Sequence, residues 1–251
     1  MGVRTYVRSP AAIAWTLAAV AGIGATVTAG WELAVVLASS SAIADTAVLG
    51  ELGAIVLLAV VLAAVAAVSA AVWLPCAAAI AYAVGRRVRG HPASIPATLG
   101  VVRARSEPLY RWAKTTVAVG ALADRLLTEN DTAPAEIAAG CGGFVLPAIV
   151  LDAPTLSAAV DRANRVVPRP GRERVQFGGL AVTAALAAGG WGLGTAFDGP
   201  LLVRPVAAAL PPSPALLVAG VVVGLVATAA LDTAWRAGAY AASDPNEGFA
   251  R

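Results

Sequence analysis

A run of 33 residues without a charged side chain, Leu52 to Val84, most strongly limits what this chain can fold into. In water such a run would need complete burial, whereas a bilayer core about 30 Å thick accepts a helix of roughly 20 apolar residues. As one helix, the run is roughly 50 Å long at about 1.5 Å per residue. We therefore predict one long transmembrane helix over 52–84, with a kink at Pro75, where the backbone lacks an N–H group.

The composition of the whole chain is typical of a membrane protein. Of its 251 residues, 59% are hydrophobic and 13% are charged, against about 45–50% and about 25% in soluble domains. We predict an all-α fold, a polytopic bundle of about six transmembrane helices in one domain over 1–251, with a second kink at Pro147. The spans lie near 11–30, 52–84, 109–128, 134–151, 175–197 and 215–231, and residues 243–251 form a flexible tail.

The start of the chain has two interpretations. Arg4 and Arg8 precede an apolar stretch, as they would in a cleaved secretory signal. The stretch runs from Ala11 to about Ile43 with only Glu32 charged, which is longer than the roughly 7–15 apolar residues of a signal. An uncleaved first span is the prediction, and a cleaved signal is the alternative.

Arginine placement predicts the orientation. Sixteen of the 18 basic residues fall on one side of the predicted bundle, and the other side holds only Arg125 and Arg204. Because short cytoplasmic loops carry an excess of Lys and Arg, we predict a protein of the cell membrane with its N- and C-termini in the cytoplasm. The third span is the most polar of the six, since it includes Lys114, Asp124 and Arg125.

Two amphipathic segments, 90–105 and 153–167, follow the second and fourth spans. Both have apolar residues at helical spacing beside arginines, so we predict two interfacial helices on the cytoplasmic side. Since each follows a pair of spans, the order also predicts a parallel internal repeat. The arginines are expected to contact anionic lipid headgroups, at about 1 kcal/mol each. They are Arg103 and Arg105 in the first segment and Arg162 and Arg165 in the second.

Asp152 lies between the fourth span and the second amphipathic segment. Its carboxylate can cap the helix expected to begin near Pro154, by accepting hydrogen bonds from backbone N–H groups at the positive helix end. Alternatively, Asp152 and Arg162 form a cytoplasmic site that binds a partner or a lipid headgroup.

The same region carries a resemblance. Phe144-Val145-Leu146-Pro147 is followed by Asp152 and by Ala159-Val160-Asp161-Arg162, and Arg111-Trp112 stands at the start of the third span. These residues resemble the pattern of a family of uncharacterised polytopic membrane proteins from bacteria and archaea, over roughly 85–174. The family often has Glu at the acidic position and Ser after the Arg, where this chain has Asp152 and Ala163. The resemblance implies a fold of about six spans and no particular activity.

The sequence favours a non-catalytic scaffold or accessory protein with an arginine-rich cytoplasmic face. His91 is the single histidine, so no His-based triad or zinc-ligand spacing exists, and no cofactor or metal is expected. The net charge of +3 is explained by cytoplasmic loops, so we expect membrane lipids as partners and no nucleic acid. A small-molecule or lipid permease with a cavity between the repeats is the alternative, followed by a lipid-modifying enzyme.

Overall fold

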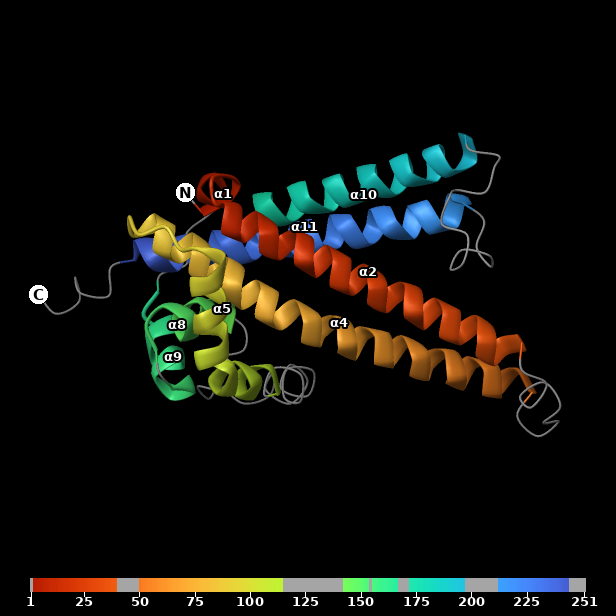
Figure 1. Ribbon diagram of the computed structural model, residues 1–251, viewed down its shortest axis with the longest axis horizontal. Helices are drawn as coiled ribbons and strands as arrows, with labels where there is room; N and C mark the ends of the chain where they lie inside the picture. Colours follow the sequence, from red (N-terminus) through yellow and green to blue (C-terminus); the bar gives the residue numbers. More distant parts are fainter. Residues whose placement is uncertain are drawn as a thin grey trace, which may run out of the picture. The chain divides into compact units, whose positions relative to one another are not determined.

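The structure, a computed structural model, describes residues 2–39, 50–114, 142–153, 155–166, 172–196 and 212–243. These residues are helical almost throughout and include no strand, which confirms the predicted all-α class for the described part of the chain (Figure 1). Residues 106–114 are helical as well. The labelled helices are α1 (Gly2–Val7), α2 (Pro10–Ser39), α4 (Gly50–Val88), α5 (Ile95–Ala104), α8 (Gly142–Leu151), α9 (Leu156–Ala163), α10 (Arg172–Ala196) and α11 (Pro212–Ala242).

In the part of the chain that the structure describes, four helices are long and apolar enough to cross a membrane. Their most apolar stretches are only 6% to 22% buried within the structure, so most of their apolar side chains face outward, which suits lipid and not water. They match the first, second, fifth and sixth predicted spans and support a membrane protein. The candidate spans are Pro10–Leu37, Ile55–Val88, Val175–Ala196 and Pro214–Ala242.

The other two predicted spans fall largely outside the described residues. Only 109–114 of the third span is described, and the fourth is represented by α8, whose ten residues rise about 15 Å. Six spans and the internal repeat therefore stay predictions. The tail after Ser243 also lies outside the described residues.

Two of the long helices extend well past their predicted spans. The first span was expected to end near 30, but α2 continues to Ser39. The sixth span was expected to end near 231, but α11 continues to Ala242. Asp232 and Arg236 form an ion pair of 2.5 Å one turn apart, which stabilises the additional helical turns. As predicted, α4 is a single helix with Pro75 inside it, and α8 contains Pro147. The kinks at these two prolines stay predictions.

The chain divides into two compact units, and each is described by itself. Unit 1 comprises Met1–Leu17, Leu74–Phe177 and Ala229–Arg251, and unit 2 comprises Ala18–Trp73 and Gly178–Thr228. Each of the four candidate spans contributes residues to both units.

Unit 2 consists of two antiparallel helix contacts made at glycines. In the first, Gly22 and Gly30 of α2 lie against Val72 and Val65 of α4. In the second, α10 and α11 approach backbone to backbone. A Cβ at Gly190 would overlap the carbonyl oxygen of Leu216, and a Cβ at Gly220 would overlap that of Leu186. Small residues allow this close approach in membrane helices, where interhelical packing replaces the hydrophobic effect.

Further along the α10–α11 contact, two threonines meet. The hydroxyl oxygens of Thr183 and Thr228 lie 3.3 Å apart, beside Gly179 and Gly224. The GxxxG pattern of α11, Gly220 to Gly224, thus mediates packing within the chain.

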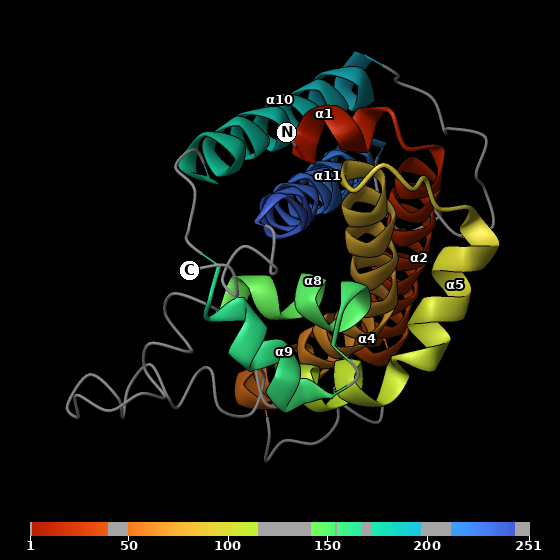
Figure 2. The ribbon, with the colours of Figure 1, turned by 90° about the vertical axis from the view of Figure 1, so that its left-hand side faces the viewer.

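Helix α8 forms the centre of unit 1. Seven of its residues are buried, in contrast to the outward-facing candidate spans. At its end, Leu151 contacts α4 at Gly85, and at its start the ring of Phe144 lies 6.3 Å from that of Trp235 in α11. Helix α9 packs on α8 (Figure 2). The buried residues of α8 are Phe144, Val145, Leu146, Pro147, Ala148, Ile149 and Val150.

The beginning of the chain also belongs to unit 1. Gly2 in α1 lies against the backbone of α11, where a Cβ at Gly2 would overlap the carbonyl oxygen of Ala234 and a Cβ at Gly238 would meet the Cα of Gly2. The hydroxyls of Tyr6 and Thr16 are hydrogen-bonded at 2.7 Å. The first and last helices of the described chain are therefore in contact.

Candidate functional site

The end of α4 sets the position of the site's main cation. Gly90 has φ of +84°, a conformation that glycine adopts without steric strain. The N–H of Gly90 donates to the Arg87 carbonyl at 3.1 Å, and the N–H of His91 donates to the Arg86 carbonyl at 2.9 Å. This Schellman pattern ends the helix and leaves Arg89 at its C-cap.

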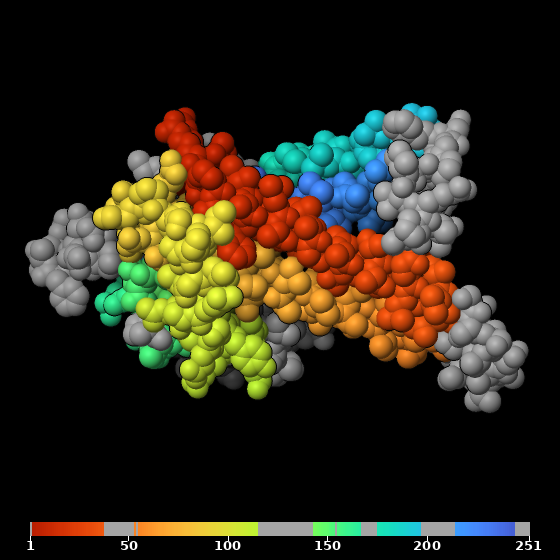
Figure 3. Space-filling view, viewed as in Figure 1, coloured from red at the N-terminus to blue at the C-terminus, as the bar shows by residue number. Residues whose placement is uncertain are grey.

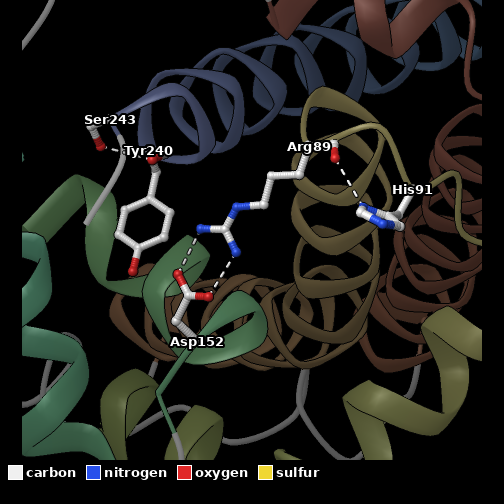
Figure 4. Close-up of polar contacts among 5 residues, drawn as sticks. All are labelled: Arg89, His91, Asp152, Tyr240 and Ser243. Carbon is white, nitrogen blue, oxygen red and sulfur yellow. Dashed lines mark hydrogen bonds and ion pairs between the residues drawn. The ribbon is translucent and has the colours of Figure 1, made fainter. Parts of the chain in front are cut away.

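Arg89 and Asp152 form a bidentate ion pair. Nη1 and Nη2 of Arg89 each donate to one carboxylate oxygen of Asp152, both at 2.7 Å (Figure 4). Asp152 directly follows α8, where the N–H groups of Asp152 and Ala153 both donate to the Ala148 carbonyl. Side chains of both partners are mostly buried. The pair joins the end of α4 to the end of α8 with the geometry that is strongest for guanidinium and carboxylate.

Tyr240 of α11 completes this cluster. Its ring lies 6.0 Å from Cζ of Arg89, a distance at which a cation interacts with an aromatic face. The side chain is 3% exposed, and the buried hydroxyl has no hydrogen-bond partner in the described part of the chain. In Figure 4 the hydroxyl faces the carboxylate of Asp152, close enough to favour its charge without completing a well-formed hydrogen bond.

The environment holds Asp152 in its charged form. Burial by itself would raise the pKa of this carboxyl group. The hydrogen bonds and charge of Arg89, the Tyr240 hydroxyl and the charge of Arg162 together outweigh burial, so the pKa of Asp152 lies below its ordinary value. Asp152 is therefore an ionised partner for arginine at neutral pH.

A second ion pair lies on the same helix as Tyr240. Asp232, Arg236 and Tyr240 are spaced four residues apart and so share one face of α11. Arg236 binds Asp232, and its guanidinium lies against Gly143 at the start of α8, where a Cβ would come within 2.7 Å of Nη1. The polar face of α11 therefore lies along α8.

The structure corrects the predicted role of Asp152. The N-cap of α9 is Thr155, whose hydroxyl oxygen accepts a hydrogen bond from the N–H of Ala158 at 3.4 Å. The helix begins at Leu156, two residues after Pro154, but its cap is Thr155 and not Asp152, so the cap interpretation was wrong. Both carboxylate oxygens of Asp152 bind Arg89 instead, because a guanidinium offers two parallel charged donors.

The predicted arginines have different surroundings. Arg162 lies near enough to Asp152 for its charge to lower the carboxyl pKa, as the alternative interpretation of these two residues required. Arg165 is exposed beyond the end of α9. Arg103 is exposed on α5, and Arg105 is the C-cap residue of that helix. The structure thus brings together Asp152 and Arg162, and it adds Arg89 and Tyr240.

Sequence reasoning missed Arg89 and Tyr240. Arg89 precedes Gly90 in the pattern Arg-Arg-Val-Arg-Gly, which indicates a helix end but not the partner of each arginine. Tyr240 follows Asp232 and Arg236 at helical spacing, and this polar stripe was a usable signal for a buried face.

The arrangement is suited to holding helices together. Arg89 binds both oxygens of Asp152 and lowers the pKa of this carboxyl group, which makes it a weak base for a substrate proton. Within the described ranges, no three His, Cys, Asp or Glu side chains gather as metal ligands would. Comparison with protein-family models, curated proteins and solved structures finds no match to this chain. The resemblance to a polytopic family therefore stays a prediction.

Proposed function

We propose that this chain is a multi-pass protein of the cell membrane, with six spans and both termini in the cytoplasm, that acts as a non-catalytic scaffold. One observation carries the proposal. All 14 arginine and lysine residues that the structure describes belong to unit 1, and the described part of unit 2 contains none. Because Lys and Arg are retained on the cytoplasmic side of membranes, this distribution supports a cytoplasmic location for the charged parts of unit 1.

The ends of the candidate spans support the same orientation. Basic residues precede α2, end α4, begin α10 and lie in the last part of α11, so they alternate between the N-terminal and C-terminal ends of successive spans. Such alternation fits helices that cross the membrane in alternating directions. It also requires an even number of crossings between α4 and α10, which the predicted third and fourth spans supply. The residues are Arg4, Arg8, Arg86, Arg87, Arg172, Arg174 and Arg236.

The surface of unit 2 is suited to lipid. Most of the exposed large apolar side chains of the described chain lie in this unit. In water a continuous surface of this kind would cause aggregation, whereas in a bilayer it needs no cover. Examples from all four candidate spans are Val36, Ile55, Val60, Leu193 and Leu225.

The polar groups of unit 1 support a fixed, non-catalytic role more than transport. Asp152 and Asp232 are each bound by an arginine of a neighbouring helix or turn. A transporter would need ionisable groups that exchange partners within the spans. The exposed arginines are left to bind anionic lipid headgroups, or a protein of acidic surface, at the cytoplasmic side.

Cysteine accessibility in intact cells tests the topology. Single cysteines are introduced by Ser213→Cys, Asn130→Cys and Ser106→Cys, after Cys76 and Cys141 are replaced by alanine, and labelled with a membrane-impermeant maleimide. We expect labelling at 213 and 130 and none at 106 until the cells are permeabilised. Labelling at 213 alone would overturn six spans in favour of four. Labelling at 106 in intact cells would overturn the orientation and the scaffold proposal with it.

Lipid retention tests the role of the basic residues. The purified protein is incorporated into nanodiscs of phosphatidylcholine and phosphatidylglycerol in equal shares, and lipids that remain bound after mild detergent release are identified by native mass spectrometry. We expect enrichment of phosphatidylglycerol that weakens as salt is raised, because screening reduces interactions between exposed charges. Equal retention of the two lipids would contradict lipid binding by these arginines.

A further inference from the structure

The two short helices that the sequence treats as equivalent expose different surfaces. On α9 and its flanking residues, no apolar side chain is exposed within the described range 155–166. Ala159, Ala163 and Val166 are buried. Every exposed residue there is polar, and Leu156 and Val160 are only partly exposed, so this surface suits water more than lipid. The exposed residues are Thr155, Ser157, Asp161, Asn164 and Arg165.

The segment 95–114, here called the platform, exposes apolar, aromatic and basic side chains together. Ile95 is 48% exposed and Tyr110 is 67% exposed. Arg103, Arg111 and Lys114 are exposed as well, and Arg111 forms an ion pair with the exposed Glu107, so the segment keeps a net positive charge. In Figure 3 the yellow-green surface of the platform lies in the foreground, with no other element over it. This combination is typical of segments at the level of the lipid headgroups.

Internal contacts fix which side of the platform faces outward. The indole N–H of Trp15 in α2 donates to the hydroxyl oxygen of Thr98 at 2.7 Å, and Thr98 is fully buried with Val102 on the same face of α5. Leu109 is buried in the following helical stretch. Because these residues face inward, Ile95, Arg103 and Tyr110 must face outward.

We infer that the platform lies on the anionic lipid surface of the cytoplasmic leaflet, whereas α9 faces the aqueous cytoplasm. The inference rests on the proposed function, and it names the residues that contact lipid. Charge complementarity decides the occupant: basic side chains near an anionic membrane surface contribute about 1 kcal/mol each, and Tyr and Trp are enriched at that depth. On this inference, one of the two predicted interfacial helices is bound to lipid and the other faces water.

Fluorescence quenching tests the two depths. A fluorophore is attached to Ile95→Cys, Tyr110→Cys or Ser157→Cys in the cysteine-free chain, in nanodiscs that contain lipids with a nitroxide at the headgroup level. We expect strong quenching at 95 and 110 and weak quenching at 157. Equal quenching at all three positions, or stronger quenching at 157, would overturn the inference.

A label at Val60→Cys separates failure of this inference from failure of the proposed function. Val60 is an outward-facing residue of a candidate span, so a nitroxide on the acyl chains should quench it. Quenching at 60 without quenching at 95 and 110 would overturn only the lipid-bound platform. No quenching at 60 would overturn membrane insertion itself.

Charge variants test the lipid that is bound. Arg103→Gln with Lys114→Gln is compared with Arg165→Gln, which removes an exposed charge next to α9, in the native mass spectrometry assay. We expect enrichment of phosphatidylglycerol to fall by up to about fivefold for each platform charge removed and to stay unchanged for Arg165→Gln. If Arg165→Gln reduced the enrichment of phosphatidylglycerol, or if the platform variant did not, the assignment of lipid binding to the platform would be contradicted. Unchanged quenching of the Val60 label confirms that each variant remains inserted.

Discussion

Trp15 donates its indole N–H to the hydroxyl oxygen of Thr98, a residue 83 positions away in the sequence, at 2.7 Å. The same Thr98 hydroxyl donates to the carbonyl of Ile95 at 2.6 Å, within the first turn of α5. Ser94 caps this turn, because its hydroxyl oxygen accepts a hydrogen bond from the N–H of Ala97. The orientation of α5 on the first span thus depends on one threonine that serves two hydrogen bonds.

Thr98→Val is expected to loosen α5. The valine keeps the volume but leaves the indole N–H of Trp15 without its partner, which costs about 1–3 kcal/mol when the donor is buried. Hydrogen exchange of the α5 amides, measured by mass spectrometry in nanodiscs, should become faster, whereas exchange in α8 should not. Trp31→Phe serves as the control, because it alters an exposed tryptophan of α2, the helix that also contains Trp15. Equal protection of α5 in wild type and Thr98→Val would show that the bond does not hold the helix.

Arg89→Gln and Asp152→Asn should each destabilise the protein by about 1–3 kcal/mol, because each leaves a mostly buried charge without its partner. The double variant should lose less than the sum of the two, since both changes remove one interaction. Unfolding by SDS titration in mild detergent measures these differences. Arg111→Gln, which breaks an exposed ion pair with Glu107, should change stability by under about 1 kcal/mol. If the stability loss of the double variant equalled the sum of the two single losses, the Arg89–Asp152 pair would contribute nothing to stability.

The ion pair should also make stability depend on pH. The pKa of Asp152 is lower in the folded protein than in the unfolded chain. Its contribution is therefore complete above the unfolded value of about 4 and is lost as the pH falls toward and through the folded value. Melting temperatures measured across this acid range should fall less steeply for Asp152→Asn than for wild type. If the melting temperatures of both proteins fell equally with pH, the lowered pKa of Asp152 would be contradicted.

Gly90→Ala is expected to destabilise the end of α4. At φ of +84°, a residue with a Cβ is about 1–2 kcal/mol less favourable than glycine, and the change should displace Arg89 from Asp152. Gly100→Ala is the matched control, because Gly100 lies within α5 with no atom near the position of a Cβ. We expect that control to raise stability by about 0.5–1 kcal/mol. Thermal unfolding in detergent distinguishes the two, and equal effects would show that the conformation of Gly90 is unimportant.

Two neighbouring glycines of α10 should respond in opposite ways. A Cβ at Gly190 would overlap the Leu216 carbonyl, whereas a Cβ at Gly189 has open space. Gly190→Ala should separate α10 from α11 and destabilise the protein by about 1–3 kcal/mol, and Gly189→Ala should be neutral or slightly stabilising. SDS titration provides the measurement. A loss with Gly189→Ala instead would indicate that another surface covers that face of α10.

The sequence predicted the long helices well, because a run of about 20 apolar residues has few alternatives in lipid. It also predicted short helices close to the positions of α5 and α9. It could not identify the partner of Asp152, since Arg89 lies 63 residues earlier and other arginines are nearer in the chain. The sequence could not predict the difference in exposure between α5 and α9 either. Both have apolar residues at helical spacing, and only the packed structure shows that Ile95 is exposed whereas Ala159 and Ala163 are buried.

The contact of Gly2 with Ala234 and Gly238 has a consequence for biosynthesis. The ribosome makes α1 before its packing surface on α11, so α1 has no native contact with α11 while the helices between them are synthesised. Completion of unit 1 must therefore wait for α11, which then covers α1. A nascent chain stalled before Ala234 would hold α1 uncovered, and would be a substrate for the proteases that survey unassembled membrane proteins.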